Sequence, residues 1–246
     1  MPPELLACQN VREALYLFRL FPLSTLRKIR TIWLTDSGGR YLMNYVKTFI
    51  FGILAGISIS IGGTVFLSLD NKVLGAVFFT VGLFTVCTFG FDLFTGKVCY
   101  VFDRDLPYAL SVIVMWAGNF VGAWLTAFAE SLTRIGPALQ EKAVTMCTVK
   151  SDDSFLSLFI LGIFCDILIY IGVDGYNKNP HEVGKYLSLL FGVTVFILCG
   201  TEHCVADMYY FSIAGMWNPH TLLCLLVISL GNAFGGVLLP LVRRLR

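Results

Sequence analysis

Charged residues are scarce in this sequence. Aspartate, glutamate, lysine and arginine make up 14% of its 246 residues, whereas 57% are hydrophobic, and the mean hydropathy is +0.76. Such a chain has more apolar surface than one soluble core can bury, which excludes a soluble globular protein. Its apolar segments are too long for the short alternating strands of a membrane barrel. We therefore expect an all-α integral membrane protein whose partner is a lipid bilayer and not a nucleic acid.

Paired cysteines and clustered histidines are also missing. None of the eight cysteines forms a C-x-x-C pair, and six lie within apolar segments, so we expect free thiols that pack in the interior. Of the three histidines only His203 lies in an apolar segment, and its neighbours of metal-ligand type are Glu202 and Asp207. This set is too small to indicate a metal centre, and we expect no cofactor.

Six apolar segments are long enough to cross a bilayer as helices. We place them at 45–69, 73–102, 106–129, 155–173, 184–214 and 221–242. The second and fifth are too long for one straight crossing, and each contains a polar, glycine-rich interruption, at 90–96 and 200–207. We therefore predict six transmembrane helices, of which the second and fifth are broken.

The segment before the first span has a different character. In residues 1–41, basic side chains alternate with Leu, Phe and Trp, which predicts an amphipathic helix at the cytoplasmic membrane surface, while residues 42–246 form the six-helix domain. Thirteen basic residues lie on the side of the two termini. The opposite side has four: Lys72, Arg134, Lys142 and Lys150. This asymmetry places both termini in the cytoplasm of a cell that carries the protein in its inner or plasma membrane.

Glycine-rich motifs recur along the chain. Those at 52–56, 90–96 and 118–122 return at offsets of 110, 110 and 113 residues. A unit of three spans ends on the opposite side of the membrane from where it begins, so the second unit crosses the membrane in the inverted orientation. We therefore predict two inverted three-helix repeats with a pathway at their interface. Asn119 and Asn232 follow glycines, and we expect them to support close helix packing.

The two interruptions carry the polar groups. Leu93 and Phe94 beside Thr95 suit an irregular loop that narrows a pore, and the alternative is a kinked helix in which the threonine bonds to its own turn. His203 could be a satisfied buried histidine, or a neutral imidazole that donates a hydrogen bond to an anion.

Three charged residues flank these groups. We expect Glu202 to bind neighbouring backbone donors, because a helix points it about 100° away from His203, and Asp92 occupies the corresponding place in the second span. Lys97 could attract an anion or could extend its ammonium group to the membrane surface.

The motifs at 92–96 and 202–208 resemble the formate-nitrite transporter family, over about residues 45–242, and the run at 90–97 is most similar to its hydrosulfide-channel branch. The resemblance implies an aquaporin-like fold and a homopentamer with one pore per protomer for small monovalent anions. Hydrosulfide is favoured, and formate, nitrite and chloride are also expected to pass.

The resemblance also implies residue roles. Thr95 and His203 would meet between two apolar constrictions, and Lys150 would be a basic position on the outer side. The cytoplasmic constriction would contain Leu83, Leu93 and Phe94, and the periplasmic one Phe79 and Phe196. The chain departs from the family pattern at three positions: Lys97, Asp166 and Asp207.

Two other functions remain as alternatives. A pore for water, glycerol or ammonia could use the same kind of repeat, although no Asn-Pro-Ala motif lies at either interruption. An intramembrane enzyme could use His203 with Glu202 or Asp207 as an acid–base pair, but no nucleophile accompanies them, so we expect no enzyme.

Overall fold

The computed structural model describes residues 37–245, and within this range the chain is helical, without a strand. The helices are α3 (Ser37–Ser68), α4 (Lys72–Phe89), α5 (Phe94–Val98), α6 (Leu106–Ser131), α7 (Gly136–Asp152), α8 (Phe155–Lys178), α9 (Glu182–Leu198), α10 (Cys204–Ala214) and α11 (Pro219–Arg243), with the short η1 (Val101–Asp103). Several begin where the sequence supplies a side-chain cap: Asn71, Asp105, Ser154 and Asn218.

The chain divides into two units, Met1–Val46 and Lys47–Arg246. Of the first unit only the beginning of α3 is described. The amphipathic helix expected over 1–41 therefore lies almost entirely outside the described residues and stays a prediction. The second unit contains the remaining helices and both interruptions.

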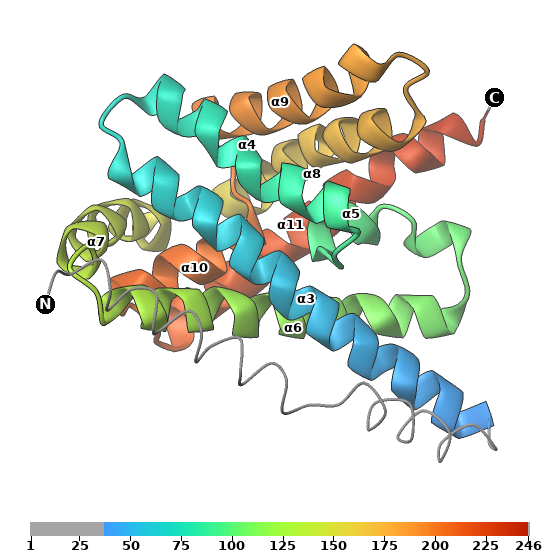
Figure 1. The fold of residues 1–246 in the computed structure, drawn as a ribbon, viewed down its shortest axis with the longest axis horizontal. Coiled ribbons are helices and arrows are strands. Elements are labelled where there is room, and N and C mark those ends of the chain that lie inside the picture. Colours follow the sequence, from blue (N-terminus) through green and yellow to red (C-terminus); the bar gives the residue numbers. More distant parts are fainter. Residues whose placement is uncertain (1–36, 246) are drawn as a thin grey trace, which may run out of the picture. The chain divides into compact units, whose positions relative to one another are not determined.

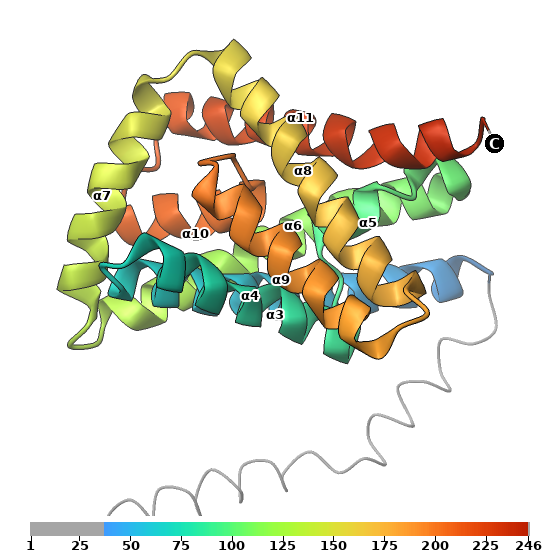
Figure 2. The same ribbon diagram turned by 90° about the horizontal axis from the view of Figure 1, so that it is seen from above.

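Within residues 37–245, five helices are long and apolar enough to cross a membrane: Asn44–Ser68 within α3, then α4, α6, α8 and α11. The bounds of four of them agree with predicted spans to within about five residues, whereas α4 covers only the part of the second predicted span that precedes the interruption. The predicted fifth span is occupied by α9 and α10, neither of which reaches 18 residues. Figures 1 and 2 show α9 beside α4 and α8, and α7 running across one end of the other helices. We did not predict α7, because its polar sequence gives no signal of a span.

Both predicted interruptions are present, and each begins with a glycine in the left-handed region. Gly90 and Gly200 have φ values of 68°, which a residue with a Cβ rarely adopts. The first interruption is shorter than expected. We predicted an irregular loop through Gly96, but Phe94 already begins α5.

The two halves also repeat the same close helix packing. A Cβ atom on Gly118 of α6 would lie 3.1 Å from the Cα atom of Gly52 in α3, and one on Gly231 of α11 would lie 3.2 Å from that of Gly162 in α8. The helix backbones therefore approach each other where only glycine fits, as the repeat predicted.

Candidate functional site

His203 and Thr95 connect the two interruptions. The Nε2 atom of His203 lies 3.0 Å from the Oγ1 atom of Thr95, and both residues are buried. His203 is the N-cap of α10, and its Nδ1 atom accepts the backbone N–H of Ala206 at 3.1 Å. In a neutral imidazole the proton then resides on Nε2, so the N–H of His203 points at Thr95.

Thr95 is polarised by this bond. Its Oγ1 atom accepts from His203, and among residues 37–245 its own hydroxyl hydrogen has no other acceptor. The hydroxyl can therefore donate to a guest. The imidazole is fixed on its other side by stacking on Phe196, with ring centroids 5.6 Å apart and an interplanar angle of 19°.

Asn119 of α6 holds the first interruption. Its Oδ1 atom accepts the backbone N–H of Phe94 at 2.8 Å, and its Nδ2 group donates to the carbonyls of Gly52 (2.8 Å) and Asp92 (3.0 Å). These bonds satisfy backbone groups that the broken helix leaves free, and they explain why α5 starts at Phe94.

Asn232 of α11 does the same for the second interruption. It accepts the N–H of Cys204 at 2.9 Å and donates to the carbonyls of Gly162 and Glu202, both at 2.8 Å. Both asparagines therefore lie where support was expected, at equivalent positions of the two repeats.

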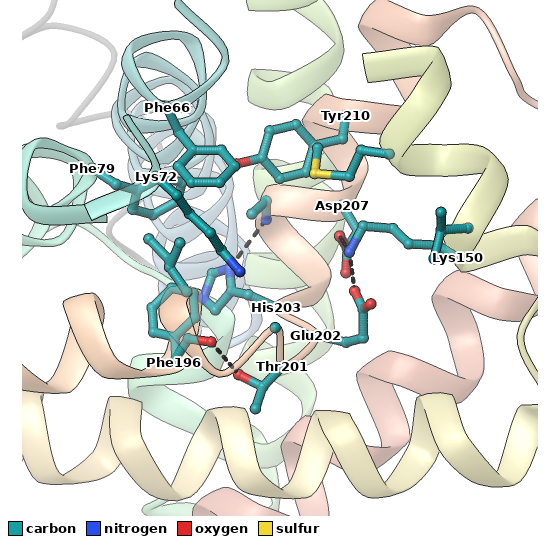
Figure 3. Close-up of a pocket in the computed structure, with 15 residues that line it drawn as sticks. Phe66, Lys72, Phe79, Lys150, Phe196, Thr201, Glu202, His203, Asp207 and Tyr210 are labelled. Carbon is teal, nitrogen blue, oxygen red and sulfur yellow. Dashed lines mark hydrogen bonds and ion pairs between the residues drawn. The ribbon is translucent and has the colours of Figure 1, made fainter. Parts of the chain in front are cut away.

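A cavity of about 270 Å³, which we call the His203 cavity, has His203 in its wall (Figure 3). One part of its wall is aromatic, where Phe79 meets Phe196 edge to face at a centroid distance of 5.9 Å. Its lining residues include Phe66, Lys72, Phe79, Lys150, Phe196, Thr201, Glu202, His203, Asp207 and Tyr210.

A second cavity, of about 100 Å³, lies along the other half of α4, and we call it the Lys97 cavity. It is lined by Leu83, Val86, Cys87, Gly90, Phe91, Leu93, Gly96, Lys97, Val173 and Asn177. Phe79 of the first cavity and Leu83 of the second are one helical turn apart, or about 6 Å along the axis. The two cavities are thus separated by a short apolar barrier.

Most residues predicted to line a pore lie at this barrier. Leu83 and Leu93 face the Lys97 cavity, and Phe79, Phe196 and His203 face the other. Phe94 and Thr95 are also buried, but they line neither cavity. Thr95 reaches the first cavity only through its bond to His203, and its neighbour Gly96 lines the second.

Lys150, expected as an anion-attracting residue, lies between two carboxylates. Its Nζ atom pairs with Glu202 and lies 3.0 Å from Oδ1 of Asp207, and all three side chains are largely buried. Burial alone would lower the pKa of Lys150, but the carboxylates of Asp207 and Glu202 raise it above its ordinary value. Glu202 was expected to bind backbone donors, and this was wrong: its side chain binds Lys150, because the helix α7 brings an ammonium group to it.

Lys97 is also paired. Its Nζ atom lies 3.8 Å from Oδ1 of Asp92, and the lysine side chain is 40% exposed. Asp92 also binds through its backbone, where its N–H donates to the carbonyl of Phe51 at 3.3 Å. The side chain of Asp92, expected like that of Glu202 to bind backbone donors, pairs instead with Lys97.

The other two departures from the family pattern, Asp166 and Asp207, are both buried carboxyl groups. The carboxyl group of Asp166 is fully buried, and neither of its oxygens has a hydrogen-bond partner in the described part of the chain. It lines neither cavity. Asp207 lines the His203 cavity, and its Oδ2 atom is likewise without a partner within residues 37–245.

Sequence reasoning missed Lys72 and Tyr210 in the cavity wall. Lys72 was read only as a basic residue in a connection, although its place just after a helix-capping Asn could have indicated a helix start. Nor do residues 37–245 contain a group of three His, Cys, Asp or Glu side chains that could hold a metal ion.

Comparisons with known proteins agree on one family. Residues 35–244 match the sequence profile described as Formate/nitrite transporter. The "Uncharacterized transporter YrhG" of Bacillus subtilis (strain 168) is 30% identical over 150 residues, which are 56% of each chain. "Formate-nitrite transporter 3" of Toxoplasma gondii (strain ATCC 50611 / Me49) is 28% identical over 69% of this chain and 34% of its own. The chain thus spans less than two thirds of the length of these relatives.

The fold has a solved counterpart. A structure entitled "Pentameric formate channel with formate bound" superimposes with a TM-score of 0.71 at 23% identity, covering 82% of this chain and 97% of that one. The arrangement of the helices is therefore that of this structure.

Proposed function

Because the chain belongs to the formate/nitrite transporter family, we propose that it conducts small monovalent anions across a cell membrane. The observation that supports this most directly is the Thr95–His203 contact, which lies between two cavities and joins the two interruptions. The family is one of transporters, and we propose no catalytic activity.

The Thr95–His203 contact can offset part of the free energy that an anion loses when it gives up its water in the pore. Moving a bare ion into an apolar medium costs tens of kcal/mol by Born estimates, so an anion crosses the barrier only if donors replace its water. The hydroxyl hydrogen of Thr95 is the donor available there, and the Nε2–H of His203 becomes a second donor where the anion replaces Thr95 as its acceptor. Because Ala206 occupies Nδ1, the imidazole can offer this proton without carrying a positive charge.

Hydrosulfide is our favoured permeant, with formate, nitrite and chloride also passing. The support is the sequence at 90–97 and the small size of the Lys97 cavity. At about 100 Å³ it has room for an ion of a few atoms, since a cavity of roughly 10–15 Å³ in the same measure already holds one water molecule.

We further propose a homopentamer with both termini in the cytoplasm. The asymmetry of basic residues supports the orientation, and the likeness to a structure entitled a pentameric formate channel supports the assembly. In this orientation the His203 cavity faces away from the cytoplasm, because Lys72 and Lys150 lie on its side.

The test is flux into liposomes of hydrosulfide, formate, nitrite, chloride, glycerol and water, in the parent protein and in variants of His203. His203→Asn keeps an acceptor for the N–H of Ala206, as an N-cap residue, but removes the donor to Thr95. His203→Gln can place an amide N–H near the position of Nε2. We expect anion flux to follow the order parent, Gln, then Asn and Ala together, with Asn and Ala at least about tenfold slower because a charge-assisted hydrogen bond is lost.

The matched control is His181→Ala, since His181 lies in a connection and its side chain caps no helix. This variant should conduct like the parent. Equal anion flux in parent and His203→Asn would contradict the role of the donor. Movement of glycerol and water alone would replace the anion channel by a neutral-solute pore.

A further inference from the structure

The His203 cavity contains four charged side chains in an unequal arrangement. Lys150 lies between Glu202 and Asp207, so this cluster has one ammonium group for two carboxylates. Its formal charge with all groups ionised is negative. An incoming anion therefore gains no attraction from Lys150, whose charge is already compensated.

Lys72 is the fourth charged residue, and its situation is different. In the described residues no carboxylate lies within ion-pair distance of its Nζ atom, which instead donates to the carbonyl of Leu198 at 3.4 Å. Leu198 is the last residue of α9, and its carbonyl is one of those that a helix end leaves free. The bond therefore holds an ammonium group at the edge of the second interruption.

Figure 3 shows how the two lysines divide the cavity. Lys72 enters from the side of Phe66 and Phe79, and its amino end, which binds the carbonyl of Leu198, points into the pocket. Lys150 enters from the opposite side and points at Glu202 and Asp207. The uncompensated positive charge thus enters the cavity from the side of Phe66 and Phe79.

We propose that Lys72 is the residue that draws anions into the His203 cavity, while Lys150 positions Glu202 and Asp207. This inference rests on the proposed anion conduction. A charged group at the mouth of a low-dielectric cavity raises the local concentration of its counter-ion, and the effect weakens as salt screens it. With Lys72 the four groups sum to a formal charge of zero, and without it to −1.

A purely structural role makes a different prediction. If Lys72 served only to cap α9, its removal would lower stability and maximal flux at every salt concentration. Attraction of the permeant acts mainly on the concentration at which flux saturates, and this effect fades with ionic strength. Salt dependence therefore separates the two roles.

The experiment measures initial rates of formate entry into proteoliposomes against formate concentration, at low ionic strength and with about 0.5 M of a large impermeant salt, sodium gluconate. The variants are Lys72→Met and Lys72→Arg. Lys142→Met is the matched control, because Lys142 is on the same predicted side but its ammonium group pairs with the exposed Asp70 at 2.7 Å. All Lys→Met changes remove the same charge.

We expect Lys72→Met to raise the half-saturating formate concentration about 3- to 10-fold at low salt, a modest part of the range for electrostatic steering. The difference should shrink at high salt, Lys72→Arg should stay close to the parent, and Lys142→Met should not differ from it. A parental response in Lys72→Met, or a loss independent of salt, would overturn the inference while leaving the channel intact. A parent that carries no formate would overturn the proposed function and this inference together.

Discussion

At the scale of single residues, Lys150 is a buried charge held between two buried carboxylates. Its side chain is 11% exposed, and those of its partners Glu202 and Asp207 are 7% and 1% exposed. Removing one member of such a group leaves buried charge without compensation, which costs more than an exposed ion pair contributes.

We therefore expect Lys150→Met to lower the free energy of unfolding by about 3 kcal/mol, because two buried carboxylates lose their partner. Thermal unfolding in detergent would measure this. Adding Glu202→Gln and Asp207→Asn to the same variant should restore most of the loss, since no uncompensated charge remains. Lys142→Met is the control and should stay within about 0.5 kcal/mol of the parent, as exposed pairs contribute little. A Lys150→Met protein as stable as this control would show that the buried pairs are not needed.

The residue types at the site could be predicted from the sequence, but their partners could not. Ionisable side chains within an apolar run identify Glu202, His203 and Asp207 as unusual. Nothing in the run says that Lys150, 52 residues before Glu202, binds two of them. Pairing of this kind depends on how α7 packs, and its polar sequence carries no periodic signal.

At the scale of elements, the two interruptions depend on one asparagine each. Asn119 and Asn232 make equivalent sets of three hydrogen bonds to the backbone on either side of a break. Such a side chain replaces the helical bonds that the break removes, so a short helix can restart in the interior.

We expect Asn119→Ala to destabilise the protein by about 2 to 3 kcal/mol, because buried backbone groups at Phe94, Asp92 and Gly52 lose their partner. Anion flux should fall as well, since α5 carries Thr95. Asn44→Ala provides the comparison, as Asn44 is exposed on α3 and lines neither cavity. Unfolding in detergent and liposome flux would be measured on the same preparations. Unchanged stability in Asn119→Ala would mean that the break does not need its cap.

The elements differ in how far sequence reasoning reached. Spans and breaks were predictable, because long apolar runs and glycines report directly on membrane helices and left-handed backbone. The start of α5 at Phe94 was not, since its cap comes from Asn119, 25 residues along the chain. A short sequence pattern predicts the local backbone conformation, but a hydrogen bond from a residue far along the chain can change where a helix begins.

At the scale of the whole molecule, the two repeats have equivalent helix packing and backbone breaks but present different polar side chains at those breaks. Equivalent glycines and asparagines hold both breaks, yet one break presents Thr95 and the other His203. The sequence spacing predicted the common scaffold. It did not predict that the cavities differ, with about 270 Å³ on one side and about 100 Å³ on the other, because cavity size depends on side chains from several helices.

A further property follows from where the cavities lie. Both cavities and the contact between them are built from one chain, so we expect each protomer of the proposed homopentamer to conduct independently. Co-expression of parent and His203→Ala chains with different tags would give mixed pentamers. Flux per protein should fall in proportion to the parental fraction, to about half at equal amounts, whereas a pathway shared by five subunits that all needed His203 would retain only about 3%. A steep, non-linear loss would place the route on the symmetry axis of the assembly and not within the protomer.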